Sequence, residues 1–139
     1  DLGKTVKFKA VTFGSDLSKA TAIDVKPYGL NMRPLRPANA KAEKQANGDW
    51  LITWIERPRM DNNLRDYTEL THDVDWAGFA VAIKQGSTIK RTATSVTNSF
   101  VYTVAMQTAD FGGVQTSLEA QVVQMSTVVG GGYAAEIVA

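Results

Sequence analysis

Apolar side chains alternate with smaller or polar ones along two segments in the middle of the chain. Trp50, Ile52 and Trp54 recur at every second position, and the turn signal Asn47-Gly48-Asp49 comes directly before them. Phe79, Val81 and Ile83 repeat the pattern before Gln85-Gly86-Ser87. Because side chains of a strand point to opposite faces in turn, both segments predict half-buried β-strands.

Weaker signals of the same kind predict further strands. We expect 38–46 to be an extended first strand of the domain, 87–94 to be a strand, and 118–125 to be the last clear one. A strand over 100–108 would place Tyr102, Val104 and Met106 on one face, with a turn at 110–113. The pattern totals six or seven short strands, with turns at the spacing typical of sandwiches.

The absence of long helical periods between these strands argues against a parallel α/β sheet. The predicted fold class is therefore all-β: a sandwich of about seven antiparallel strands in two sheets packed face to face. We expect its interior to hold the side chains of Trp54, Phe79, Val81, Tyr102 and Val104.

Both ends of the chain differ from this middle part. Residues 1–29 predict an N-terminal β arm, or the end of a preceding domain, because Val6, Phe8 and Ala10 alternate with lysines and a second short strand is expected at 22–25. Pro34 and Pro37 mark the entry to a domain over 30–127. Residues 128–139 form a Gly-rich C-terminal segment, in which Gly130-Gly131-Gly132 predicts a flexible hinge.

Composition removes several classes of function. The 139 residues include 15 Lys and Arg against 14 Asp and Glu, a formal net charge of +1, which does not favour a nucleic-acid partner. The chain has no Cys, which excludes disulfides and thiolate metal sites. We expect no membrane span, since no apolar run approaches about 18 residues. Residue 1 is Asp, so a processed product or a piece of a longer protein is expected.

Few residues offer catalytic or metal chemistry. His72 is the single His, and a metal site would combine it with Glu69, Asp73 or Asp75. Zinc sites usually need more than one His or Cys, and calcium loops need a tighter repeat of oxygen ligands. A nucleophile activated by His72 would need an adjacent Ser, and the Ser residues stand in turn-like contexts. We therefore predict no catalytic, cofactor-binding or metal-binding residues, and no enzyme activity.

Aromatic and basic residues could contact a partner. Trp50 and Trp76 could form a surface that stacks on sugars or docks a protein, although burial is the more common role of such rings. Arg57, Arg59 and Arg65 could contact a polyanion, but pairing with neighbouring acidic residues is the more common outcome.

The order of these motifs resembles a fibronectin type III domain. An early strand ends in Trp54, and a later segment has Tyr102, Val104, Met106, Asp110 and Gly112 in the order that this family uses. The resemblance implies an immunoglobulin-like sandwich.

A narrower resemblance covers roughly 30–127. The run 54–61, then Arg91-Thr92, Tyr102-Thr103 and Asp110-Phe111-Gly112, is similar to the C-terminal module of tail hub proteins of siphophages and gene transfer agents. It implies a structural, non-catalytic module of a tail tip or baseplate hub in the virion, which serves assembly and host attachment. It also implies other tail-tip proteins or copies of the chain as partners, with a homotrimer of the full hub, and host surface glycan as a further partner.

Two other functions fit the same residues. A carbohydrate-binding adhesin module would use Trp50, Trp76 or the loop of Arg57 and Arg59. An accessory domain of a secreted bacterial hydrolase would leave catalysis to another part of that protein. Fold alone does not choose among these functions.

Overall fold

The computed structural model describes residues 2–60 and 71–139. The chain divides into two compact units, Asp1–Met32 and Arg33–Ala139, and each is described by itself. The predicted boundaries at 29/30 and 127/128 stay predictions. The elements in order are β1 (Val6–Lys9), η1 (Leu17–Lys19), β2 (Ala22–Val25), η2 (Leu30–Met32), β3 (Ala38–Lys44), β4 (Trp50–Ile55), β5 (Trp76–Gln85), β6 (Thr88–Ser95), β7 (Ser99–Tyr102), α1 (Val104–Phe111), β8 (Glu119–Ser126) and β9 (Gly130–Val138).

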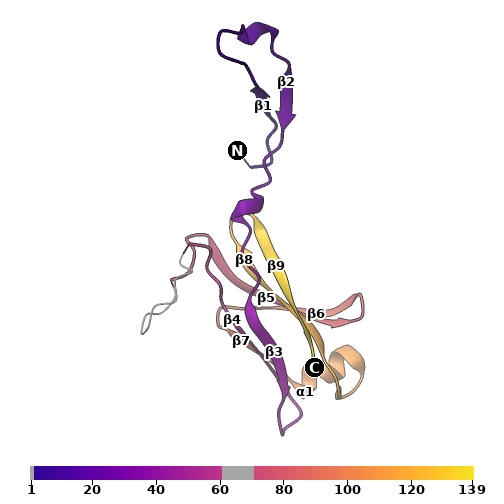
Figure 1. Ribbon diagram of the computed structural model, residues 1–139. Helices are drawn as coiled ribbons and strands as arrows, with labels where there is room; N and C mark the ends of the chain where they lie inside the picture. The colour runs from indigo at the N-terminus through magenta and orange to yellow at the C-terminus, as the bar shows by residue number, and fades with distance from the viewer. Residues whose placement is uncertain (1, 61–70) are drawn as a thin grey trace. The chain divides into compact units, whose positions relative to one another are not determined.

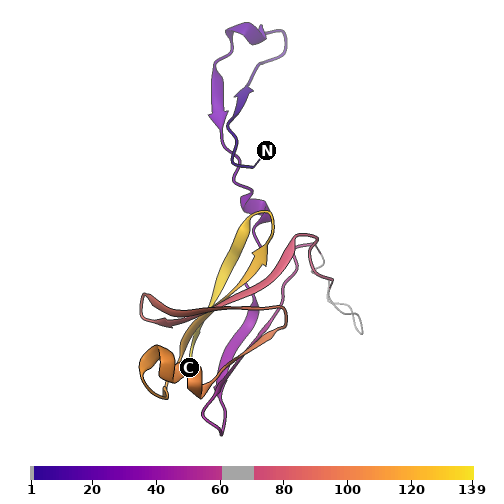
Figure 2. The same cartoon turned by 180° about the vertical axis from the view of Figure 1, so that it is seen from behind.

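The larger unit is a sandwich of seven antiparallel strands. One sheet has the strand order β3-β4-β7, and the other has the order β6-β5-β8-β9. The two sheets lie in separate layers with their strands crossing at an angle, as the opposite views show (Figure 1, Figure 2). The predicted all-β sandwich is therefore confirmed.

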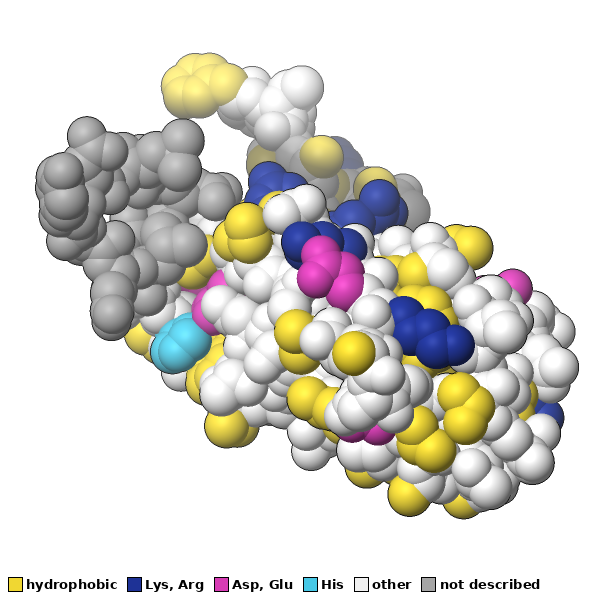
Figure 3. Space-filling model, turned by 90° about the horizontal axis from the view of Figure 1, so that it is seen from below, with side chains coloured by type: hydrophobic (Ala, Val, Ile, Leu, Met, Phe, Trp, Pro, Cys, Tyr) yellow, Lys and Arg dark blue, Asp and Glu magenta, His cyan; other side chains and the backbone are white. Residues whose placement is uncertain are grey.

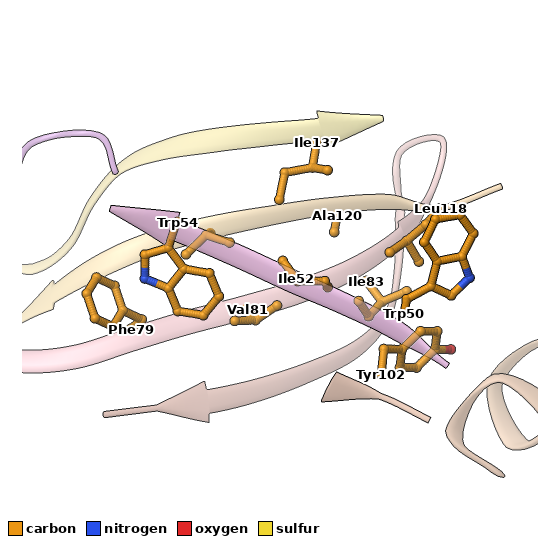
Figure 4. Packing of buried hydrophobic residues seen from close by; sticks show 11 residues of the cluster. Trp50, Ile52, Trp54, Phe79, Val81, Ile83, Tyr102, Leu118, Ala120 and Ile137 are labelled. Carbon is orange, nitrogen blue, oxygen red and sulfur yellow. The ribbon is translucent and has the colours of Figure 1, made fainter. Parts of the chain in front are cut away.

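The interior is built by the alternating rows that the sequence predicts. Trp50, Ile52 and Trp54 point inward from β4. Trp54 lies beside Phe79 and Val81 of β5, whereas Trp50 lies beside Leu118 at the other end of the core (Figure 4). The rings of Trp54 and Phe79 pack edge to face with centroids 5.2 Å apart, an arrangement that aromatic pairs prefer. Trp54, Phe79, Val81 and Tyr102 are buried as predicted.

The segment after Tyr102 is a helix, so the predicted strand over 100–108 is wrong beyond residue 102. β7 ends at Tyr102, and α1 begins at Val104, whose side chain is only partly buried and lies outside the core cluster. Thr103 caps α1 by accepting a hydrogen bond from the Met106 amide, and Gly112 ends it in the left-handed conformation, with φ of 79°.

Contacts from distant residues hold α1 in place. Asp49 Oδ1 accepts a 2.7 Å hydrogen bond from the Val104 amide, which is otherwise without an intrahelical partner at this end of a helix. Gln107, fully buried, donates from Nε2 to the carbonyl oxygens of Gly48 and Tyr102 at 3.0 and 3.2 Å. α1 is therefore fixed to the turn between β3 and β4.

The C-terminal segment is a strand rather than a hinge. Gly130 to Gly132 begin β9, which pairs with β8 from Glu119↔Val138 to Ser126↔Gly130. A Cβ on Gly132 would lie 2.4 Å from the Pro34 carbonyl oxygen, so the glycine permits a close approach of two backbones. The expectation of flexibility at these three glycines is wrong.

The smaller unit is a two-stranded hairpin. β1 and β2 pair antiparallel, with Val6 opposite Val25 and Phe8 opposite Ile23. Both predicted strands of the arm are confirmed.

Candidate functional site

Six polar side chains meet where β4 leaves the sandwich and the chain returns to β5. We call this group the loop-base network: Glu56, Arg59, His72, Asp73, Asp75 and Ser126. Four of its members, the three carboxylates and Ser126, are buried. Burial of several charges is costly unless each is paired, so their partners determine what this site can do.

Asp73 holds the two sides of the loop together. Its carboxylate accepts hydrogen bonds from the backbone amides of Arg59 and Met60 at 3.0 to 3.1 Å, and from Arg59 Nε at 3.0 Å. Burial alone would raise the pKa of Asp73, but these amide and guanidinium hydrogen bonds outweigh burial and hold the pKa below its ordinary value. Asp73 is therefore a charged anchor rather than a proton donor.

Asp75 connects Arg59 to Ser126, the last residue of β8. Its Oδ1 pairs with the Arg59 guanidinium, and its Oδ2 accepts a hydrogen bond from the Ser126 hydroxyl. Ser126 Oγ in turn accepts from the amides of Val128 and Val129, both at 3.1 Å. These bonds satisfy buried backbone and side-chain groups where β8 ends, so this part of the network has a structural role.

His72 pairs with a different carboxylate. His72 Nδ1 lies 2.7 Å from Glu56 Oε1, and its ring stacks on the indole of Trp76 with centroids 3.8 Å apart and planes 6° apart. The Glu56 side chain is buried, whereas that of His72 is half exposed. Trp76 also packs edge to face on Phe79, so the stacked rings of His72 and Trp76 contact the core.

This arrangement does not suit the metal site considered from the sequence. Asp73 and Asp75 face Arg59, whose positive charge occupies the place a cation would take, and Glu69 lies outside the described residues. Within 2–60 and 71–139, no group of three or more His, Asp or Glu side chains is placed to hold a metal ion. His72 and Ser126 bond to different carboxylates, so they do not form a nucleophile and its base.

The aromatic candidates for sugar stacking are both occupied. Trp50 is 4% exposed and belongs to the core, so burial, the more common role expected of it, is confirmed, and the alternative of a binding surface does not hold for this ring. Trp76 is partly exposed, but His72 covers one face of its ring.

The basic candidates have separate fates. Arg59 pairs with Asp73 and Asp75, so pairing with acidic residues, the more common outcome expected, is confirmed, although these two partners lie 14 and 16 positions away and are buried. Arg57 is exposed, and its backbone is held by Gln124, whose amide oxygen accepts from the Arg57 amide at 2.7 Å while its Nε2 donates to the Arg57 carbonyl at 3.1 Å. Arg65 lies outside the described residues.

A second polar cluster joins β6, β7 and α1. Arg91 donates from Nε and Nη2 to the two carboxylate oxygens of Asp110 at 2.6 and 2.9 Å, and the Tyr102 hydroxyl donates to Asp110 Oδ2 at 2.8 Å. The hydrogen bond from Arg91 is the main cause that lowers the pKa of Asp110. Burial, and then the hydrogen bond to Asp110, raise the pKa of Tyr102, which stays a neutral donor.

These three residues come from the motifs that resemble the tail hub module. The sequence predicted Asp110 in a turn after the strand of Tyr102, and this placement is wrong because Asp110 lies in the last turn of α1. The residues are nevertheless in contact, through a two-point Arg–carboxylate pair that is geometrically specific.

One face of the described surface carries mixed charge. On the face seen from below, basic side chains lie beside acidic ones and among hydrophobic ones, instead of gathering into one basic region (Figure 3). Among the described residues, no helix has the length and apolarity needed to cross a bilayer.

Comparison with known proteins identifies the fold. No protein-family model matches the chain, and the search of curated proteins gave no match. The chain is similar to the rat CD45 extracellular region, domains d3-d4, with 14% identity and a TM-score of 0.53 over 100% of this chain and 65% of that chain. It is also similar to the Clostridium perfringens spore cortex lytic enzyme SleM, with 10% identity and a TM-score of 0.50 over 91% of this chain and 36% of that chain.

The chain therefore spans less than two thirds of either matched structure. At these identities the likeness concerns the fold alone, and it confirms an immunoglobulin-like β-sandwich. Neither of the two proteins is a phage tail protein, so the tail-hub resemblance stays a prediction.

Proposed function

We propose that this chain is a non-catalytic structural module of a phage-type tail tip or hub, located in the virion, that serves assembly and host attachment. Its partners are other tail-tip proteins and copies of itself, in a homotrimer of the full-length hub, and host surface glycan. The proposal deepens what the fold establishes, a β-sandwich module of a kind also found in an extracellular region and in a lytic enzyme.

The observation that carries the proposal is the cluster of Arg91, Tyr102 and Asp110. These residues belong to three separate motifs of the tail-hub resemblance. Arg91 and Asp110 are 19 positions apart in the chain, and yet all three residues are in contact through Asp110. A chance set of short matches would not be expected to meet in one ion pair. The cluster links α1 to β6 and β7 through hydrogen bonds, and such links stabilise the fold, as a structural module requires.

The loop-base network supports a non-catalytic role. Asp73 and Asp75 both pair with Arg59. The pKa of Asp73 is lowered, so this carboxylate is not prepared to donate a proton near neutral pH. Active sites usually hold a carboxyl group with a raised pKa or a nucleophile beside a base. The buried charges of this site instead close the base of a loop.

The proposal is tested by locating the chain in particles. Antibodies raised against the purified chain are applied to particles from the organism that encodes it, and immunogold labelling is scored on heads, tail shafts and tail tips. The proposal expects label at the tail tip, and it expects fewer particles to adsorb to host cells when the antibody is added before infection. Particles without label, together with detection of the chain in the culture supernatant as part of a cell-wall hydrolase, would refute it and favour the accessory-domain function.

The glycan component has its own test. A glycan array probed with the tail particles and with the same particles blocked by antibody should show loss of binding after blocking. Binding that persists after blocking would remove glycan from the list of partners.

A further inference from the structure

The turn between β3 and β4 presents an Asn-Gly pair to solvent. Asn47 is exposed, and Gly48 follows it with φ of 90°, in the left-handed region. A residue without a side chain leaves its backbone amide open to approach the side chain of the Asn before it. The amide nitrogen can then attack the carbon of the Asn carboxamide, a reaction that makes Asn a labile residue. Asn47 is therefore a candidate for spontaneous modification.

Hydrogen bonds orient the Asn47 carboxamide. Its Oδ1 accepts from the Asp49 amide at 3.1 Å, and its Nδ2 donates to Asp49 Oδ2 at 2.8 Å. A backbone N–H aimed at a carbonyl oxygen stabilises the negative charge that develops there during nucleophilic attack. The Gly48 amide donates to the Gln45 carbonyl oxygen at 2.9 Å, so the reaction requires this bond to open. Gln45 is exposed as well, and exposed turns open locally at little cost in free energy.

The same turn holds α1, so a change at Asn47 reaches beyond the turn. Asp49 Oδ1 accepts from the Val104 amide at 2.7 Å, and Gln107 Nε2 donates to the Gly48 carbonyl oxygen at 3.0 Å. Deamidation would replace Nδ2 of Asn47 by a carboxylate oxygen, which would face Asp49 Oδ2 where a donor now lies at 2.8 Å. Two neighbouring carboxylates repel each other when both are charged. The repulsion would act directly on the carboxylate that holds the first residue of α1.

We propose that Asn47 is a deamidation site, and that its conversion loosens α1 from the turn between β3 and β4. The Gly48 amide nitrogen forms a bond to Asn47 Cγ, and the bond from Cγ to Nδ2 breaks. The proton lost by the Gly48 amide ends on the departing nitrogen, which leaves as ammonia. Water then opens the cyclic succinimide at either carbonyl group and gives aspartate or isoaspartate. The reaction needs only water, and the inference is independent of the proposed tail location.

Ageing of the purified full-length chain tests the chemistry. The chain is incubated in mildly alkaline buffer with and without guanidinium chloride, and its proteolytic peptides are followed by mass spectrometry. In the folded sample, the peptide that carries Asn47 should gain the mass of an amide-to-acid conversion, as aspartate and isoaspartate forms. Asn39 and Asn98, which precede Ala and Ser, should keep their amides while Asn47 converts. Conversion of Asn47 only in the unfolded sample would mean that the turn protects it, and would overturn the inference.

A pair of variants tests the effect on α1. Asn47→Asp introduces the charge of the product, whereas Asn47→Ser removes the carboxamide without a charge and keeps a side chain that can accept from an amide two residues on. The midpoint of thermal unfolding should fall by about 4–8 °C in Asn47→Asp and by less than half as much in Asn47→Ser. Amides of 104–111 should exchange at least about fivefold faster in Asn47→Asp than in the unmodified chain. Unchanged exchange along 104–111, or equal effects of the two variants, would overturn the link to α1.

Discussion

Replacing Gly132 by Ala should destabilise the sandwich, although the position lies in a run of three glycines. The added Cβ would lie 2.4 Å from the Pro34 carbonyl oxygen, 2.7 Å from Pro34 Cβ and 2.9 Å from its carbonyl carbon. Two of these three atoms belong to the backbone and cannot rotate away, so β9 or the segment around Pro34 must shift. Such a shift strains the 3.2 Å hydrogen bond from the Tyr133 amide to the same carbonyl oxygen.

The cost follows from these contacts. Overpacking a close contact costs about 1–3 kcal/mol, and a weakened backbone hydrogen bond adds about 1 kcal/mol. We therefore expect the free energy of unfolding to fall by about 2–4 kcal/mol. In a unit of this size the midpoint of thermal unfolding should fall by roughly 8–16 °C.

Gly131→Ala is the matched control because it makes the same chemical change one residue earlier in β9. Its Cβ would meet Val123 Cγ1 at 3.4 Å, an ordinary contact at the flexible end of a side chain. The expected change is within about 0.5 kcal/mol. Urea unfolding followed by Trp fluorescence measures both variants. If the three glycines were a hinge, both substitutions would be neutral or slightly stabilising, and equal small effects would refute the reasoning.

Three further outcomes follow from the polar contacts. Gln107→Leu leaves the carbonyl oxygens of Gly48 and Tyr102 without their donor, and it should lower the free energy of unfolding in urea by about 2–4 kcal/mol. A change below about 0.5 kcal/mol would contradict a stabilising role of these Gln107 hydrogen bonds. The pKa of Asp110 is lowered in the folded chain, so its charge stabilises the fold above the unfolded pKa of about 4, and this stabilisation is lost as the pH falls below that value. Asp110→Asn should therefore lose less free energy of unfolding than the unmodified chain between neutral and acidic pH in the same assay. His72→Ala should change Trp fluorescence by uncovering the Trp76 ring, with a loss of stability below about 1 kcal/mol, and an unchanged spectrum would contradict the stack.

The strands of the core could be predicted because their signal is local. In β4 and β5 every second side chain is large and apolar, and this period is visible within six residues. The turn at Gly48 and the early strand of the hairpin have equally local signals. These features depend on neighbouring residues, so a single sequence contains them.

The helix α1 could not be predicted in this way. Val104 and Met106 alternate like strand residues, and eight residues are too few to display a helical period. The helix depends on Asp49 and Gln107, which form hydrogen bonds across 55 and 59 positions of the chain. The need for glycine at position 132 could not be predicted either, because it arises from the close approach of Pro34, which is distant in the sequence.

The loop-base network was only partly visible in the sequence. Its acidic residues stand out, but nothing local shows that Arg59 would pair with both Asp73 and Asp75. Ser126 of the network, and Gln124 outside it, carry no signal at all, since polar residues at inward positions of β8 resemble an ordinary break in the pattern. Their partners, Arg57 and Asp75, are 67 and 51 positions away.

The most direct test of the account is whether side chains of the two sheets share one dry interior. In the full-length chain, nuclear Overhauser effects are measured between the Trp54 indole of β4 and the Phe79 ring of β5, whose centroids are 5.2 Å apart. The account predicts strong effects between these rings and slow amide exchange along both strands. Rings that show no mutual effect, together with amides that exchange at the rate of an open chain, would contradict it.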